Sequence, residues 1–185
     1  MKTGQVVYTK TTEDGKKLLM RYPKRTDAEM MMEYINILSK EKTFITAQGE
    51  QKTLEEEKVY LRDQLAKIKA GTAVQLLLFL DDMLVGISEV SMKNKVDSHI
   101  GGLGISLHRN ARGQRLGTLL MKVVLSEAKR ALPKLKILTL SVFGQNVRAL
   151  SLYRKFGFIE YGRLPKGVRY RNRFDDHVLM YKNIR

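Results

Sequence analysis

The sequence contains no cysteine and no tryptophan, and only three of its 185 residues are proline. Without a thiol there is no disulfide framework, no cysteine nucleophile and no thiolate metal site, and we expect no metal. No uninterrupted apolar run reaches the roughly 18 residues that cross a bilayer. The first residues also lack the basic-then-apolar pattern of a secretory signal. These absences predict a cytoplasmic protein without a membrane segment.

Acidic residues are few in comparison with basic ones. The 19 Asp and Glu residues stand against 34 Lys and Arg residues, which gives a formal net charge of +15. Such a surplus attracts anionic partners at long range. Because the basic residues are scattered from Lys2 to Arg185 rather than gathered in one tract, we expect most to be solvated and nucleic acid not to be a partner. A basic RNA- or ribosome-associated module remains an alternative, although it would lack interleaved aromatic residues for base stacking.

Length and composition suit one domain over residues 1–185, since 43% of the residues are hydrophobic and can form a core. Local patterns predict strands at residues 5–10, 16–22, 74–80, 83–92, 99–107 and 136–142, and helices at residues 28–39, 54–70 and 113–132. Residues 26–29 and 53–56 both have the spacing of a capping box. Three glycines at positions 101, 102 and 104 fall inside one strand, which indicates a bulge or a close backbone approach.

A basic turn punctuated by glycine leads into the helix at residues 113–132. Residues 109–120 read RNARGQRLGTLL. The N–H groups at a helix start have no partner inside the helix and carry partial positive charge, so a tight turn there brings several onto one phosphate. Gly113 and Gly117 allow the backbone to approach a ligand, and three arginines add positive charge. The segment predicts a site for a cofactor that carries a pyrophosphate.

A second informative segment, residues 145–158, follows the apolar strand expected at 136–142. Asn146 suits a helix N-cap and Gly157 suits a helix end. Asn146 and Tyr153 are seven residues apart, nearly two helical turns, and therefore share a face. Both polar groups would then face one groove. The alternative is that Tyr153 is a core aromatic residue with its hydroxyl at the surface.

The two segments in this order resemble the GCN5-related N-acetyltransferase (GNAT) superfamily, through the pattern Asn-x-x-Ala-x-x-Leu-Tyr-x-x-x-Gly-Phe at residues 146–158. The resemblance covers residues 84–181, and more loosely the chain from about residue 21. Residues 158–163 and 172–180 are similar to the closing strands of bacterial amino-acid, peptide or polyamine acetyltransferases. The resemblance implies an α/β (α+β) fold, with a mixed, mostly antiparallel sheet of about seven strands, flanked by about four helices and splayed between strands 4 and 5.

The resemblance also implies acetyl-CoA as cosubstrate, with its pantetheine arm on a strand edge and its pyrophosphate on the basic turn. The implied cofactor-binding residues are Ile105, Ser106, Leu107, Arg112, Gly113, Gln114, Arg115, Leu116, Gly117, Thr118, Asn146 and Tyr153. Arg115 departs from the family pattern, which usually has glycine there, so one backbone contact with the pyrophosphate would be altered. We expect the Leu107 N–H to stabilise the oxyanion of the reaction.

The implied reaction moves an acetyl group from acetyl-CoA to a primary amine of a small molecule or peptide, by direct attack in a ternary complex. Tyr153 resembles the general acid of the family, and a phenol with a pKa of about 10 is protonated at neutral pH. The glutamate that many relatives use as base falls at Gly102 here. The base therefore stays open between His99, Glu89, Asp176 and a water chain.

The acceptor groove of such folds lies between the first two helices and the last strands. Five acidic residues fall in these regions: Glu55, Glu56, Glu57, Asp175 and Asp176. They predict an acidic floor for a cationic amine such as a polyamine, an aminoglycoside or a peptide N-terminus. Alternatively, the glutamates only complement a helix macrodipole. A homodimer is compatible with the resemblance, and a catalytically weak acetyl-CoA sensor or partner-binding subunit is the alternative function.

Overall fold

The computed structural model describes residues 3–184, and the strands in that range form one sheet. The sheet has eight strands, one more than expected, in the order β1-β2-β3-β4-β5-β6-β8-β7. They are β1 (Val6–Thr11), β2 (Lys17–Arg21), β3 (Ala73–Leu80), β4 (Met83–Met92), β5 (Ile100–Leu107), β6 (Ile137–Phe143), β7 (Ile159–Tyr170) and β8 (Arg173–Asn183). Neighbouring strands are antiparallel except for β5 and β6, which are parallel.

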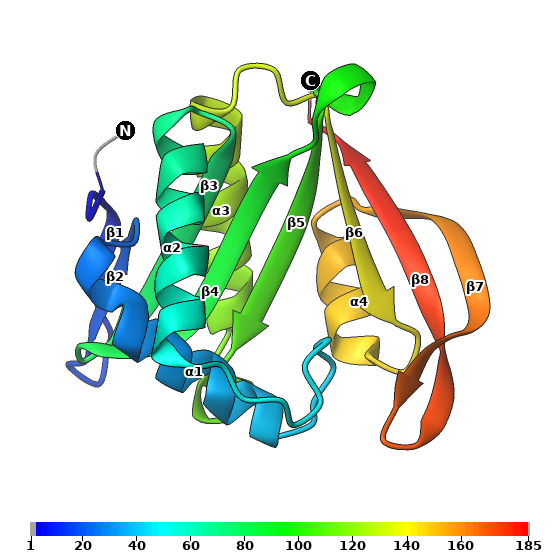
Figure 1. Cartoon of the computed structure of the whole chain (residues 1–185), viewed down its shortest axis with the longest axis horizontal. Helices are drawn as coiled ribbons and strands as arrows, with labels where there is room; N and C mark the ends of the chain where they lie inside the picture. The colour runs from blue at the N-terminus through cyan, green and yellow to red at the C-terminus, as the bar shows by residue number, and fades with distance from the viewer. Residues whose placement is uncertain (1–2, 185) are drawn as a thin grey trace.

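The α-helices of the described range are α1 (Ala28–Lys40), α2 (Leu54–Lys69), α3 (Leu116–Ala131) and α4 (Val147–Lys155). Figure 1 shows α1 and α2 on the face of the sheet turned to the viewer and α3 behind it. The helix α4 reaches the first turn of α3, because a Cβ added at Gly117 would lie 3.9 Å from Leu152 Cδ2. The mixed, mostly antiparallel fold that the resemblance implied is confirmed. None of these helices is long and apolar enough to span a membrane.

The strands β5 and β6 separate after a short parallel stretch. Residues 100–102 pair with residues 137–139, and beyond them β5 pairs only with β4 while β6 continues to pair with β8. The resulting opening between the two strands is visible in Figure 1. This is the implied splay, although in this eight-stranded sheet the two strands are β5 and β6 rather than strands 4 and 5. It leaves one backbone edge of β5 without a strand partner.

The strand β3 lies at the centre of the core. Its residues from Ala73 to Phe79 are all buried, because α2 packs on one face of the sheet and α3 on the other. On α3, Leu116, Leu120 and Val124 recur at helical spacing and are buried against the sheet. Coverage on both faces explains why β3 reads as an almost unbroken apolar run.

The two predicted capping boxes have different outcomes. At the second, Thr53 Oγ1 accepts from the Glu56 N–H at 3.2 Å and the Glu56 carboxylate accepts from the Thr53 N–H at 2.8 Å, as expected. The box expected at residues 26–29 does not form. Asp27 is the N-cap of α1, but its carboxylate does not bond the first amides of that helix. It pairs with the buried Arg21 at 2.6 Å and accepts from the Lys24 N–H at 2.7 Å, at the start of a short 3-10 turn.

The glycine-rich strand β5 is not bulged. Its register with β4 is continuous through all three glycines. Close approach does explain Gly101, where an added Cβ would lie 2.9 Å from Leu135 Cδ1. This glycine is therefore a packing requirement of the sheet.

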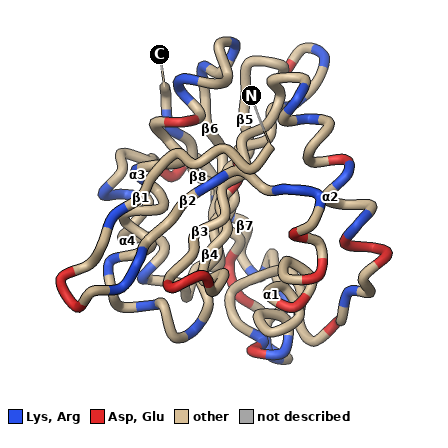
Figure 2. The backbone as a smooth tube through the Cα atoms, turned by 90° about the vertical axis from the view of Figure 1, so that its left-hand side faces the viewer, with Lys and Arg blue, Asp and Glu red and all other residues tan. Residues whose placement is uncertain are grey.

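The charged residues are distributed widely. Figure 2 shows Lys and Arg on helices, strands and connecting loops, interspersed with Asp and Glu. Most Lys and Arg residues in the described range are exposed, as expected.

Candidate active site

The turn between β5 and α3 presents six consecutive backbone N–H groups that have no acceptor. Within the described part of the chain, no amide from Gly113 to Thr118 donates a hydrogen bond, and the first bond of α3 runs from the Leu119 N–H to the Arg115 oxygen at 3.1 Å. Gly113 and Arg115 both have positive φ, at 83° and 60°. Successive N–H groups in such a turn form a concave anion-binding surface, strengthened by the partial charge of the helix start.

Arg115 adopts the backbone conformation for which glycine is best suited. It is the N-cap of α3, with φ 60° and ψ 4° in the left-handed region. A residue with a Cβ pays roughly 1–2 kcal/mol for this conformation, which gives a physical reason for the glycine of the family pattern. The Arg115 side chain is exposed. The turn therefore forms with arginine in this position, and the Arg115 N–H remains without a partner in the described chain.

The side chain of Arg112 is engaged inside the protein. Its Nε donates to the Leu107 oxygen at 3.0 Å, and its Nη2 pairs with Glu41 Oε2 at 2.7 Å. Glu41 is the C-cap residue of α1. Arg112 thus joins the end of β5, the turn and α1, and its contacts hold the turn in place.

The free edge of β5 presents alternate backbone groups to the opening. Near one end of the strand the Ile100 oxygen accepts a bond at 2.8 Å from the residue after β4, and past the other end the His108 N–H donates to β4 at 2.8 Å. Because bonding direction alternates along an antiparallel pair, the N–H groups of Ile105 and Leu107 face away from β4, toward the opening. The backbone of Ser106 faces β4 instead.

A cavity of about 400 Å³ opens beside this edge, on the face covered by α1 and α2. Its apolar lining includes Met31, Ile35, Ile87 and Ile105, and its charged lining consists of Lys52, Glu56, Glu57 and Glu89. The Tyr34 hydroxyl and Ser106 Oγ, which also line it, are hydrogen-bonded to each other at 2.9 Å. An apolar cavity with a few polar groups suits a small organic ligand.

Glu89, on β4, is held by three polar side chains. Its Oε2 accepts from the Tyr60 hydroxyl at 3.1 Å, from Gln64 Nε2 at 2.7 Å and from Gln75 Nε2 at 3.4 Å. Burial and the negative charge of Glu89 raise the pKa of Tyr60, so this phenol stays protonated and donates. All three of these bonds reach Oε2, and none among the residues described reaches Glu89 Oε1, which leaves this oxygen available to a ligand in the cavity.

The sequence interpretation missed the residues that hold Glu89. A signal was present on α2, where Glu57, Tyr60 and Gln64 follow each other at spacings of three and four residues and so share one face. Gln75 is the polar residue in the otherwise apolar strand β3. The sequence could not show that this face of α2 is turned toward β4.

The three glutamates at the start of α2 have three different environments. Glu55 is exposed and pairs with Lys58 at 2.6 Å. Glu56 caps the helix, and the Thr53 N–H bonded to its carboxylate lowers its pKa. Glu57 is buried in the cavity wall, and burial raises its pKa. The expected acidic floor therefore consists, on this helix, of Glu56 and Glu57.

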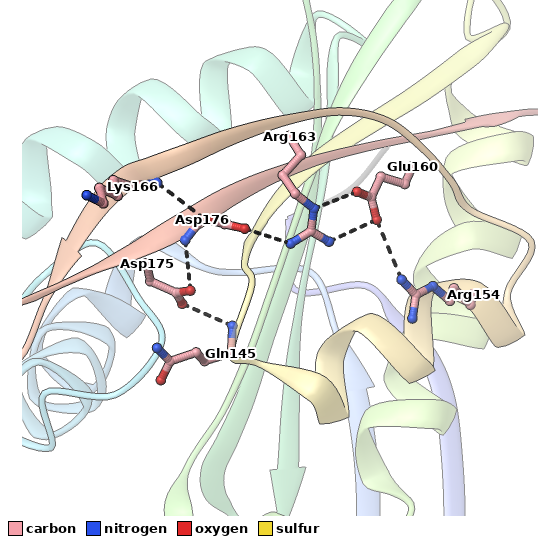
Figure 3. A network of polar contacts seen from close by, with 7 residues as sticks. All are labelled: Gln145, Arg154, Glu160, Arg163, Lys166, Asp175 and Asp176. Carbon is pink, nitrogen blue, oxygen red and sulfur yellow. Dashed lines mark hydrogen bonds and ion pairs between the residues drawn. The ribbon is translucent and has the colours of Figure 1, made fainter.

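Asp175 and Asp176 do not line this cavity and belong to a network that joins β7 and β8 to the loop before α4 (Figure 3). Asp175 is buried, and its Oδ2 accepts from the Gln145 N–H at 3.0 Å. Asp176 pairs with Arg163 at 3.1 Å and also accepts from the Lys166 N–H at 3.2 Å. These two donors, Arg163 first, hold the pKa of Asp176 below its usual range. Asp175 thus holds the loop before α4, and Asp176 connects β8 to β7.

Tyr153 and Asn146 lie on that helix and at its start. Asn146 is the predicted N-cap of α4, and its Oδ1 accepts from the Ala149 N–H at 3.2 Å. The Tyr153 ring is 7% exposed and packs edge-on against Phe158 at 6.0 Å. Burial raises the pKa of Tyr153 to about 12. The ring belongs to the core, while the hydroxyl has no hydrogen-bond partner in the described chain.

His99 lies at the other end of β5 from the turn. It immediately precedes the strand, is exposed, and its backbone oxygen accepts from the Lys136 N–H at 2.9 Å. Gly104, where β5 first lines the cavity, is five residues further on, about 17 Å along an extended strand. Of the candidate bases, the structure brings Glu89 to the cavity.

The family model described as Acetyltransferase (GNAT) family matches residues 32–158. An acetyltransferase of the GNAT family from Streptococcus pneumoniae is 30% identical, with TM-score 0.82 over 91% of this chain and 99% of that chain. A putative acetyltransferase from Salmonella typhimurium, solved with its cofactor acetyl-CoA, is 15% identical (TM-score 0.77; 91% and 94% covered). A ribosomal-protein-alanine N-acetyltransferase from Brucella melitensis is 22% identical (TM-score 0.78; 89% and 99% covered). A comparison with curated protein sequences gives no match. The chain belongs to the GNAT family and is an acetyl-CoA-dependent N-acetyltransferase.

Proposed function

We propose that this protein acetylates a primary amine of a small molecule or peptide bound in the cavity, by direct attack while acetyl-CoA is also bound. One observation carries the proposal: the Glu89 carboxylate lies in a cavity that borders the free edge of β5, and that edge leads directly into the turn with six unpaired N–H groups. An acceptor site and an anion site are thereby joined by one strand.

The residues present fit acetyl-CoA. The amides from Gly113 to Thr118 suit a pyrophosphate. The N–H groups of Ile105 and Leu107 suit an extended arm that carries amide groups, which would add to the sheet edge as a peptide strand does. Asn146 and Tyr153 would face the same opening from α4. No metal is needed for any of these contacts.

When bound, acetyl-CoA supplies an activated acetyl thioester. Glu89 Oε1 takes a proton from the acceptor ammonium, since Oε2 is already occupied by three donors. The Leu107 N–H donates to the carbonyl oxygen on which negative charge develops. Tyr153 is protonated at neutral pH, because its pKa is about 12. It would give its proton to the sulfur as the nitrogen–carbon bond forms and the carbon–sulfur bond breaks, and the second proton lost by the nitrogen would restore the phenol.

The lining of the cavity favours a cationic acceptor. Glu56, Glu57 and Glu89 face it against one positive side chain, Lys52. A primary amine is protonated and positively charged at neutral pH. The apolar wall formed by residues such as Met31 and Ile87 suits an aliphatic stem. These features support an alkylamine, or an amino group on a flexible chain, as the acceptor.

The test combines binding with turnover. We expect acetyl-CoA to raise the melting temperature of the protein, since a ligand of the folded state stabilises it. Incubation with acetyl-CoA and a mixed amine library should give an acetylated product by mass spectrometry, with an equal release of free thiol. Glu89→Gln should keep the thermal shift and lower turnover by about 10²-fold or more, whereas Glu55→Gln should change neither. A thermal shift without acetylation of any amine would contradict the proposal and favour an acetyl-CoA sensor.

A further inference from the structure

Glu57 is a buried carboxylate without a partner. The residue is 6% exposed, and within residues 3–184 its side chain makes no hydrogen bond or ion pair. Its oxygens are not sealed in the interior, because Glu57 lines the cavity and is not one of the residues with fully enclosed unpaired atoms. Burying a charge without a partner is unfavourable, so this carboxylate is arranged to meet something in the cavity.

The neighbouring charged groups do not fill this role. Lys52 lines the same cavity and lowers the pKa of Glu57 somewhat, but it is exposed and forms no ion pair with it. The Glu56 carboxylate already accepts a hydrogen bond from the N–H of Thr53, the N-cap residue of α2. Glu89 already receives three donors through Oε2. The catalytic steps proposed above use Glu89 and leave Glu57 without a function.

The carboxylates of Glu57 and Glu89 lie at different heights along the axis of α2. Glu57 lies one turn before Tyr60, whereas Glu89 is bonded both by Tyr60 and by Gln64, one turn after it. The charges of Glu57 and Glu89 both raise the pKa of Tyr60, so both lie within electrostatic reach of its hydroxyl. The helical rise places Tyr60 about 5 Å and Gln64 about 10 Å beyond Glu57 along the axis, so the two residues that bond Glu89 both follow Glu57 on α2.

We propose that Glu57 binds a second positive charge of the acceptor, so that the preferred acceptor is a short diamine or polyamine with its reacting amino group at Glu89. This inference rests on the proposed function, in which Glu89 receives that amine. A second ammonium group gives Glu57 the partner that the protein lacks, and the apolar wall accommodates the methylene chain between the two nitrogens. A monoamine leaves the buried carboxylate unpaired, and a site of this kind discriminates strongly against a ligand that lacks the matching group.

The experiment compares linear diamines from 1,3-diaminopropane to 1,6-diaminohexane with the n-alkylamine of equal length. Binding is measured by calorimetry on the full chain with coenzyme A present, and turnover by thiol release with acetyl-CoA. We expect at least one diamine to bind about tenfold or more tightly than its monoamine. Glu57→Gln should remove this advantage, so that the diamine binds no more tightly than its monoamine.

Glu55→Gln is the matched control, because it removes the same charge from the same helical turn but from an exposed residue outside this cavity. It should preserve the preference for the diamine. Equal binding of diamines and monoamines, or an equal loss of the preference in both variants, overturns the proposal. If diamine binding depends on Glu57 but no amine is acetylated, the second-charge site stands and the proposed function fails.

Discussion

Arg112 Nη2 lies 2.7 Å from Glu41 Oε2, and this ion pair connects the turn before α3 to the end of α1. The same guanidinium also bonds the Leu107 oxygen at the end of β5. Because α1 lines the cavity and the turn carries the unpaired N–H groups, one arginine connects the cavity wall to the turn.

The first prediction concerns this pair. Arg112→Ala and Glu41→Ala should each lower the free energy of unfolding by about 1–3 kcal/mol, since each leaves a poorly solvated charge without its partner. Both should also weaken acetyl-CoA binding, because the turn loses its anchor. Urea denaturation and calorimetric titration measure the two effects, and the double variant should cost less than the sum of the single ones. If only Arg112→Ala weakens binding, Arg112 contacts the cofactor directly instead.

A second prediction concerns Tyr153. Tyr153→Phe should lower kcat by at least about tenfold while leaving the dissociation constant for acetyl-CoA nearly unchanged, because it removes a proton donor and keeps the buried ring. Since the pKa of Tyr153 is about 12, its ionisation should produce no fall in activity below about pH 10. The test is to measure kcat with the true acceptor by steady-state kinetics, and the dissociation constant for acetyl-CoA by equilibrium binding, for the wild type and the variant. Undiminished turnover by the variant would show that another group protonates the sulfur.

The third prediction distinguishes the candidate bases. Glu89→Gln should remove the acidic limb of the pH–rate profile for kcat/KM, because the amide cannot accept the proton. His99→Ala should leave this limb in place, since His99 lies about 17 Å from the first cavity residue of β5. The reverse result would return the role of base to His99.

The order of elements and the position of the basic turn were accessible from the sequence because their signals are local. The predicted strand at 83–92 has the bounds of β4, and the basic turn falls between β5 and α3 as expected. The helix start was placed three residues early, at Gly113 instead of Leu116. The intervening residues form the turn, where positive φ at Gly113 and Arg115 keeps the chain out of the helix.

The acceptor cavity was not accessible in the same way, because its contacts are distant in sequence. Glu89 meets Tyr60, Gln64 and Gln75 only after α2 packs over β3 and β4. Glu55 and Glu57, two residues apart, point in different directions on a helix, one to solvent and one to the cavity. From the sequence alone, Glu55 and Glu57 were both predicted to belong to the acidic floor of the groove.

The fourth prediction concerns Arg115. Arg115→Gly should keep the affinity for acetyl-CoA within about tenfold, or roughly 1.4 kcal/mol, because the amide has the same position in either case. Relief of the left-handed strain should offset the greater flexibility of glycine in the unfolded chain, so stability should change by less than about 1 kcal/mol. Calorimetry and urea denaturation test both statements. A complete loss of binding would identify the guanidinium as a principal ligand.

The last prediction uses the pH dependence of stability at Glu57. Burial raises its pKa in the folded state, so the unfolded chain loses this proton first as pH rises. The folded state then holds more protons, and the contribution of Glu57 to stability falls as pH rises from the unfolded pKa through the folded one. Lys52 opposes the shift, and the other titratable groups that line the cavity are Tyr34, Glu56, Tyr60 and Glu89.

Glu57→Gln should therefore be more stable than the wild type at neutral pH and nearly equal to it in acid, below the pKa of the unfolded chain. An increase of 1 kcal/mol would raise the melting temperature by roughly 2–4 °C in a chain of this size. Urea denaturation at a series of pH values measures the difference, with Glu55→Gln as control. A saturating diamine should stabilise the wild type more than Glu57→Gln, because only the wild type has the carboxylate that its second charge neutralises. If the variant is less stable than the wild type at neutral pH, Glu57 has a structural partner in the folded protein. Its carboxylate is then not free to bind a ligand.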